Sequence, residues 1–321
     1  MVSVRSKIRV SNFLFVGALI TVALLAGSHP LSGQGSGANG ARLLQGAIDL
    51  HLHVDPMPYG ASFETLRLAR SRGMRGVVVK NHYESTVDLA YLLRKEMPGF
   101  EVFGGLDLNW IAGGLNHAEV EHMTQVPGKP GRFIWLTTYD SENQVRNGRL
   151  PPDQRPKNPP PPTAPFIQVS KNGELVPDVK RIISVIAKNG FVLATGHVSP
   201  EEGLMMVREG KKQGVQHMVV THPMDQPVFM NVPQMKEAAS LGAFIEFDFR
   251  NTLTGGRTDA MRQIGPQYCF ISEFWTKTQA PLEYAGLEGV AAFAAAMRKL
   301  GFTDRELDMM FKENPARVLG L

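Results

Sequence analysis

Short apolar runs of β-type composition alternate with amphipathic helical stretches, and the alternation repeats eight times along the chain. A helix between successive strands makes neighbouring strands parallel, and eight such units are typical of a closed (β/α)8 barrel. We therefore predict an α/β fold, a single TIM-type barrel over residues 45–321, with a doubly wound open sheet as the structural alternative. The expected strands lie near residues 47–54, 76–82, 101–108, 132–138, 191–198, 217–222, 243–250 and 268–273.

The intervening helices carry ordinary signals. "SFETLRLARSRG" has Phe63 and Leu66 at helical spacing. "LEGVAAFAAAMRKLG" places Phe293, Met297 and Leu300 on one stripe, and Thr303 with Glu306 predicts a capping box for the last helix.

The first 35 residues differ from the rest. Arg5, Lys7 and Arg9 precede the apolar run 13–27, and a small, polar stretch follows, which is the layout of a secretory signal. We expect residues 1–35 to be a signal peptide, or an uncleaved anchor, with a linker. The protein is accordingly expected to be exported, either periplasmic or secreted.

Charge and cysteine content narrow the function classes. The chain has 34 basic and 30 acidic residues, and three of the basic ones precede residue 36, which leaves 31 against 30, a net charge of +1. This balance predicts no nucleic-acid partner and no membrane contact beyond the N-terminal segment. A small-molecule substrate is expected and a homo-oligomer stays open. The single cysteine, Cys269, excludes an internal disulfide.

An insertion at about residues 141–176 interrupts the alternation. Eight of the 15 residues from Pro151 to Pro165 are proline, and a hairpin pattern turning at Asn172 and Gly173 follows. Because the insertion follows the fourth strand, it is expected on the carboxyl-end face of the barrel. It either overhangs the mouth or is a tolerated surface insertion.

Polar side chains gather where the predicted strands end, which is where barrel enzymes carry their catalytic groups. In the first strand, "AIDLHLHVDP", alternation puts Asp49, His51, His53 and Asp55 on one face and the apolar residues on the other. The ends of four further strands carry Lys80 and His82, His197, His222, and Glu273.

Five of the nine histidines fall at these ends. A single histidine after a strand is more often a hydrogen-bonded cap than a ligand. Several imidazoles converging in one mouth, however, repel one another if protonated and are costly to bury unpaired. A divalent cation removes both difficulties, so the convergence predicts a metal site.

The motifs "HLH" of the first predicted strand, "GHVS" of the fifth, "THP" of the sixth and "ISEFW" of the eighth, with the closing "NPARVLGL", resemble the amidohydrolase superfamily of metal-dependent hydrolases. "GMRGVVVKNHY" and "NGELVPDV" are similar to an uncharacterised branch of it. The resemblance implies that His51, His53, His197 and His222 are metal ligands and that Glu273 is a ligand, the general base, or both. It further implies one or two divalent ions, with zinc expected, and hydrolysis of a small organic ester, lactone or amide by metal-activated water.

Relatives of this kind leave rival functions open. These are a metal-dependent decarboxylase of aromatic or unsaturated carboxylic acids, a phosphotriester hydrolase, and a metal-binding or sugar-binding barrel without activity. Two departures from the superfamily pattern bear on them. Glu273 stands where aspartate is usual, and "RFIWLTTYD" after the fourth strand holds no lysine for a carbamylated bridge.

Further catalytic and substrate-binding roles remain alternatives. Lys80 is expected either to be carbamylated or to bind an anionic substrate as an ammonium, and His82 to be a ligand or a hydrogen-bonding acid. Arg250 is a candidate for gripping a carboxylate or phosphate, unless Glu246, Asp248 and Arg250 form a structural ion pair. Asn109 is a further substrate-binding candidate. Trp110 and Trp275 are candidate pocket walls.

Overall fold

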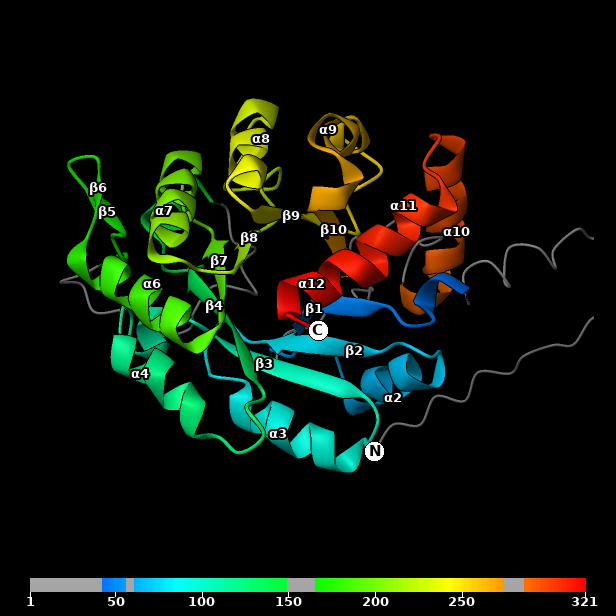
Figure 1. The fold of residues 1–321 in the computed structure, drawn as a ribbon, viewed down its shortest axis with the longest axis horizontal. Helices are drawn as coiled ribbons and strands as arrows, with labels where there is room; N and C mark the ends of the chain where they lie inside the picture. The colour runs from blue at the N-terminus through cyan, green and yellow to red at the C-terminus, as the bar shows by residue number, and fades with distance from the viewer. Residues whose placement is uncertain (1–41, 56–60, 149–164, 274–285) are drawn as a thin grey trace, which may run out of the picture. The chain divides into compact units, whose positions relative to one another are not determined.

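The computed structural model describes residues 42–55, 61–148, 165–273 and 286–321, drawn in colour in Figure 1. Eight strands form one sheet in the order β1-β2-β3-β4-β7-β8-β9-β10, and each hydrogen-bonded pair is parallel. The predicted α/β barrel is confirmed, with every strand within two residues of its expected bounds. The strands are β1 (Ile48–His53), β2 (Gly76–Lys80), β3 (Glu101–Asp107), β4 (Gly131–Thr137), β7 (Val192–Gly196), β8 (His217–Val220), β9 (Ala243–Asp248) and β10 (Cys269–Ser272).

Helices cover the outside of the sheet, as Figure 1 shows. No helix in the described segments is long and apolar enough to cross a membrane. The predicted leader, residues 1–35, lies outside the described residues. The helices are α2 (Phe63–Ser71), α3 (Val87–Glu96), α4 (His117–His122), α5 (Glu142–Asn147), α6 (Pro177–Asn189), α7 (Pro200–Gln213), α8 (Val232–Ser240), α9 (Arg257–Ile264), α10 (Gly286–Lys299), α11 (Asp304–Asp308) and α12 (Asn314–Leu319).

Two apolar clusters build the molecule, one inside the barrel and one between the strands and the helices. All eight strands contribute to the interior cluster, and Val318 and Leu319 of α12 join it. These α12 residues therefore cover the amino ends of the strands, while the carboxyl ends stay clear of them. Gly105 gives the Trp135 ring its place in the interior, because a Cβ on Gly105 would lie 2.5 Å from the ring.

The strict alternation predicted for the first strand is broken between Leu50 and Leu52. Ile48 and Leu50 both belong to the interior cluster, whereas Leu52 packs in the outer one. The pairing of β1 with β2 shifts register between Asp49 and Leu52, as at a β-bulge. An extra residue at a bulge changes which side chains face inward.

Helix ends also depart from the sequence pattern. Phe63, the first residue of α2, is 53% exposed and Leu300, just after α10, is 48% exposed, although Leu66 and Met297 of the same stripes are buried. The side chains at these ends lie where the apolar stripe no longer meets the sheet. The capping box at Thr303 and Glu306 is confirmed, and a π-helical turn, Met309–Glu313, separates α11 from α12.

The hairpin after the proline-rich segment is present. Ser170–Lys171 (β5) pairs antiparallel with Glu174–Leu175 (β6), and Asn172 and Gly173 have φ of 52° and 79° at the turn. Residues 149–164 of the predicted insertion lie outside the described residues.

Candidate metal centre

The carboxyl ends of the strands bring most of the predicted site residues together. His51 and His53 end β1, Lys80 ends β2, and His82, His197, His222 and Glu273 follow their strands by one or two residues. Ring contacts link the five histidines. The ring centroids lie 4.8 Å apart for His51 and His53, 4.9 Å for His53 and His82, 5.9 Å for His82 and His197, 5.0 Å for His197 and His222, and 5.7 Å for His51 and His222.

Two sets of ligand-type atoms lie close enough to hold a metal ion, with all atoms of a set within 4.8 Å of one another: His51, His53 and Glu273, and His53, Asp55 and His82. Glu273 Oε1 lies 3.5 Å from His51 Nε2 and 4.0 Å from His53 Nε2. His51 Nε2 is buried and makes no hydrogen bond to a described residue. Such an atom is costly to bury, and a cation between two imidazoles and a carboxylate removes the cost. The donor set fits a divalent metal such as zinc.

The other ring nitrogen of three histidines has a fixed partner. His51 Nδ1 lies 2.7 Å from Glu246 Oε1, His53 Nδ1 2.7 Å from Asp55 Oδ2, and His197 Nδ1 2.8 Å from Gln144 Oε1. When Nδ1 donates to such an acceptor, Nε2 is left unprotonated and can bind a metal. The three acceptors thus select the ligand form of each ring.

Two strand ends adopt unusual backbone conformations. Gly196 has φ of 70°, and a Cβ there would lie 2.2 Å from the Thr137 carbonyl oxygen, so only glycine fits just before His197. His222 and Glu273 are themselves left-handed, with φ of 22° and 58°. Residues other than glycine seldom adopt such values, and they concentrate at functional sites.

Hydrogen bonds and an ion pair hold Glu273. Its backbone N–H donates to Asp49 Oδ1 at 3.0 Å, and its Oε2 lies 2.6 Å from Arg250 Nη2. Asp49 Oδ1 also accepts from the backbone N–H of His51. Arg250 is paired with Asp248 as well, so an ion pair is present here, whereas a role of Arg250 in binding substrate stays a prediction.

Lys80 and His82 form a second network beside the first. Lys80 Nζ is buried, lies 3.5 Å from Asp107 Oδ2 and 5.0 Å from the centroid of the Trp135 ring, and makes no hydrogen bond to a described residue. His82 Nδ1 lies 3.0 Å from the same Asp107 oxygen and 2.9 Å from Thr138 Oγ1. Asp107 therefore joins the two predicted catalytic residues.

Burial dominates the electrostatics of this end of the barrel. It lowers the pKa of His51, His53, His82 and His197 below the usual value, and that of His222 to about 3, with the Lys80 charge adding to the effect. Burial also raises the pKa of Glu246 to about 8 and of Asp107 to about 6, and raises that of Glu273 despite Arg250. Neutral imidazoles are the form that binds metals, and a bound cation would favour the ionised carboxylates.

Asn109 follows β3 and is buried, but its amide is already engaged. Its Nδ2 donates to the His82 carbonyl and to Thr138 Oγ1, and its Oδ1 accepts from the backbone N–H of Thr138. These contacts tie the ends of three strands together. Trp110 lines a pocket with Ile167, and Trp275 lies outside the described residues.

Three partners of the site were not singled out by sequence reasoning as site residues: Asp55, Gln144 and Asp107. Asp55 stood in the quoted first strand two residues after His53, and Asp107 ends β3, so strand-end position was a usable signal for both. Gln144 is 53 residues from His197, on α5, and no local pattern indicates that contact.

Comparisons with known proteins identify a family and a shared fold. Residues 46–246 match the model of a "Family of unknown function (DUF6282)". No curated protein matches the chain. The solved structures that match include an amidohydrolase from Pseudomonas aeruginosa, 12% identical, with a TM-score of 0.61 over 89% of this chain and 99% of that one.

Two further solved structures extend the comparison. An organophosphorus hydrolase from Deinococcus radiodurans is 15% identical, with a TM-score of 0.56 over 88% of this chain and 94% of its own. An amidohydrolase from Burkholderia multivorans with bound zinc is 15% identical, with a TM-score of 0.55 over 86% and 99%. These likenesses show a shared fold.

Proposed function

The chain belongs to the DUF6282 family, whose model covers the barrel from β1 into β9, and we propose that it is a metal-dependent hydrolase of small organic esters, lactones or amides. The observation that carries the proposal is the buried set of His51, His53 and Glu273 at the carboxyl ends of β1 and β10. Its ligand atoms converge, and the Nδ1 partners of both histidines leave Nε2 to face the centre.

We assign the metal ligands as His51, His53 and Glu273, with His197 and His222 completing the site for one or two ions. When bound, a divalent cation supplies a Lewis acid that polarises the substrate oxygen and lowers the pKa of water. Zinc is the expected ion, because imidazole and carboxylate groups are its usual ligands and the Burkholderia multivorans structure holds it.

Glu273 is positioned to transfer a proton as well as to bind the metal. Its Oε1 faces the histidines while Oε2 is held by Arg250, so the carboxylate has a fixed orientation toward the centre. Arg250 acts here as a positioning residue. Lys80 and His82, joined through Asp107, lie next to the ligand set and supply a buried charge and a hydrogen-bonding ring.

The substrate screen follows from the solved structures that share the fold. They include lactonases and an organophosphorus hydrolase. We therefore propose lactones, aryl esters and phosphotriesters as the first compounds to test, followed by amides. Measurement of released carbon dioxide from aromatic acids separates hydrolysis from the rival decarboxylation.

Metal analysis of the purified protein tests the proposal directly. Elemental analysis should find one or two zinc ions per chain, and His51→Asn should lose metal and hydrolysis together. His217→Asn is the matched control, because His217 begins β8 at the opposite end, with Nδ1 against the Arg317 carbonyl. Metal-supplemented protein that holds no ion, or a His51→Asn variant that keeps its ion, would contradict the assignment.

Export remains a separate proposal, which rests on the basic and apolar composition of residues 1–35. Fractionation of expressing cells should find the protein in the cell envelope or the medium. Full-length protein in the cytoplasm would refute it.

A further inference from the structure

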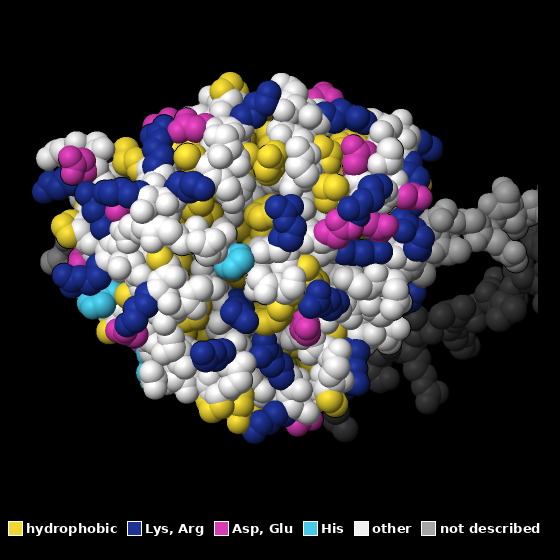
Figure 2. Space-filling model, in the orientation of Figure 1, with side chains coloured by type: hydrophobic (Ala, Val, Ile, Leu, Met, Phe, Trp, Pro, Cys, Tyr) yellow, Lys and Arg dark blue, Asp and Glu magenta, His cyan; other side chains and the backbone are white. Residues whose placement is uncertain are grey.

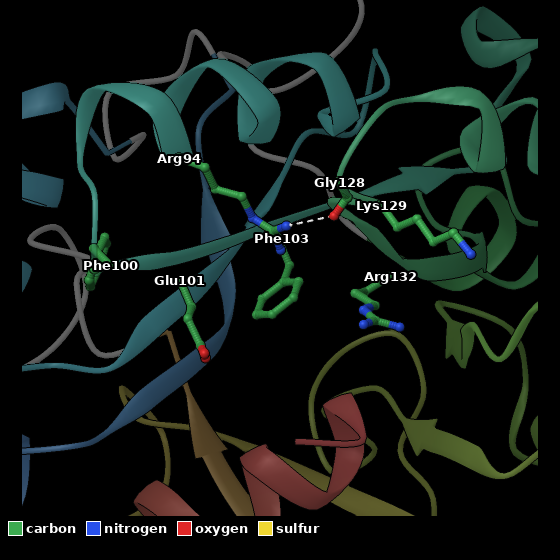
Figure 3. Close-up of a pocket in the computed structure, with 8 residues that line it drawn as sticks. Arg94, Phe100, Glu101, Phe103, Gly128, Lys129 and Arg132 are labelled. Atoms are coloured by element: carbon green, nitrogen blue, oxygen red, sulfur yellow. Dashed lines mark hydrogen bonds between the residues drawn. The ribbon is translucent and has the colours of Figure 1, made fainter.

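A pocket of about 420 Å³ lies at the amino ends of β3 and β4, at the opposite ends of these strands from the metal centre. Figure 3 shows its walls. Arg94 comes from α3, and Glu101 and Phe103 come from the start of β3. Lys129 lies in the loop before β4, and Arg132 is the second residue of β4. A volume of this size suits a small molecule.

The pocket carries more positive charge than its one acidic residue can balance. Arg94, Lys129 and Arg132 line it, and Glu101 is the acidic member of the lining. The carboxylate of Glu101 already pairs with Arg75, at 3.0 Å from its Nε. In Figure 2, Lys and Arg side chains gather over β3 and α3 on the face in view, with fewer acidic ones among them.

Phe103 holds the two guanidinium groups in place. The guanidinium carbon of Arg94 lies 4.5 Å from the Phe103 ring centroid, and that of Arg132 lies 5.7 Å from it. Arg94 also donates to the carbonyl oxygens of Val102 and Gly128, the latter drawn in Figure 3. Arg94 is therefore fixed by the fold, and its charge stays inside the pocket.

Arg132 is oriented by the ring but lacks an anionic partner among the described residues. Its Nε is buried and makes no hydrogen bond to any of them. Burial, followed by repulsion from Arg132, lowers the pKa of Arg94, and the opposing attraction of Glu101 is smaller. Packing on Phe103 explains where the Arg132 guanidinium lies, but it leaves the Nε–H donor of Arg132 without an acceptor among the described residues.

We propose that this pocket binds a small oxyanion, of the kind carried by a phosphorylated metabolite, on Arg132 with support from Lys129 and Arg94. A planar guanidinium presents paired N–H donors that match phosphate oxygens, and Lys129 supplies an exposed point charge at the rim. The site lies at the far ends of β3 and β4 from the residues proposed for hydrolysis, so it is independent of the proposed function.

Calorimetric titration of the purified, metal-loaded protein with inorganic phosphate tests the site. Chloride at matched ionic strength serves as the reference, because screening weakens unspecific attraction. We expect saturable binding of one phosphate per chain, weakened about tenfold in Arg132→Gln and about threefold in Lys129→Gln. Glu101→Gln should tighten binding, since it removes the one acidic group of the lining.

Arg181→Gln, an exposed arginine on α6, is the matched control and should leave the affinity unchanged. Arg132→Lys keeps the charge but not the paired donors, so its affinity should lie between those of the wild type and Arg132→Gln. Melting temperatures confirm that each variant is folded. Absence of saturable binding would overturn the proposal. Equal affinity in the wild type, Arg132→Lys and Lys129→Gln would also overturn it, because phosphate would then bind elsewhere, for example only at the metal.

Discussion

The orientation of single imidazole rings decides which atoms the site offers. Glu246, Asp55 and Gln144 each engage the Nδ1 of one histidine, the first two through a carboxyl group and Gln144 through an amide. A carboxylate partner makes a ligand ring more basic, whereas an amide mainly fixes its direction. Of these three rings, His197 is therefore the one whose position depends on an amide partner.

Replacing Gln144 with alanine should weaken metal binding or turnover by about 10- to 100-fold, because His197 loses the acceptor that fixes its ring. Competition with a zinc-binding dye measures the affinity. Gln125→Ala removes an exposed glutamine of the Met123–Gln125 turn and should change neither quantity. Equal affinities in the two variants would show that the contact plays no part.

Glu273→Gln should lower turnover about 10²- to 10⁴-fold, the range found for the loss of a positioned acid or base. Zinc affinity should fall with it, because a charged ligand becomes a neutral one. Steady-state hydrolysis and the dye competition report the two effects separately. Glu96→Gln, at the exposed end of α3, is the control, and a Glu273→Gln enzyme with normal turnover would exclude both roles.

At the scale of elements, the site depends on how each strand ends. Gly196 lets β7 stop against the Thr137 carbonyl and turn, so that the His197 N–H donates to that oxygen at 2.9 Å. The short loop that begins there continues into α7, whose capping box is formed by Ser199 and Glu202. The conformation of one glycine therefore sets the direction of a proposed ligand.

Gly196→Ala should destabilise the protein by more than about 1 kcal/mol and lower zinc affinity, because the new Cβ meets Thr137 in a left-handed conformation. Gly190→Ala is a matched control, with φ of 66° and no atom within 4 Å of the new Cβ. Urea unfolding compares the two variants. If Gly196→Ala lowers the free energy of unfolding no more than Gly190→Ala does, the close approach of the new Cβ to the Thr137 carbonyl oxygen has no cost.

Sequence reasoning located the elements better than their contacts. Apolar runs and glycines place the strands because burial and turns leave local signals. The bulge in β1 leaves none, so Leu52 packs on the opposite face from Ile48 and Leu50, against the alternation. Long-range partners are equally hidden: the strand-end rule predicts His197 at the mouth, whereas its contact with Gln144 depends on how α5 is placed.

At the scale of the whole molecule, the metal-free barrel holds a cluster of uncharged groups. The five site histidines have lowered pKa values, so unfolding takes up their protons below about pH 6.5 and this contribution to stability is lost as the pH falls. Glu246, Glu273 and Asp107 have raised pKa values and act in the opposite sense, since the folded state already holds their protons.

Within the site, five histidines with lowered pKa values outnumber three carboxyl groups with raised ones, so the contribution of the site to the stability of the metal-free protein should fall between pH 6.5 and 5. Urea midpoints across this range measure the effect. A variant with His197→Asn should show a shallower dependence, because one proton fewer is taken up on unfolding. Stability that rises toward pH 5 would contradict the assignment of neutral rings.

The sheet order has β1 and β10 at its two ends, and Asp49 spans them by accepting from the N–H groups of His51 and Glu273. The proposed ligands His51 and His53 belong to one of these edges and Glu273 follows the other. An ion bound by all three would link β1 to β10, the two strands at the ends of the sheet order. Stripping it should then loosen these two edges first, and exposed backbone amides there should exchange with deuterium ahead of those in β3 and β4.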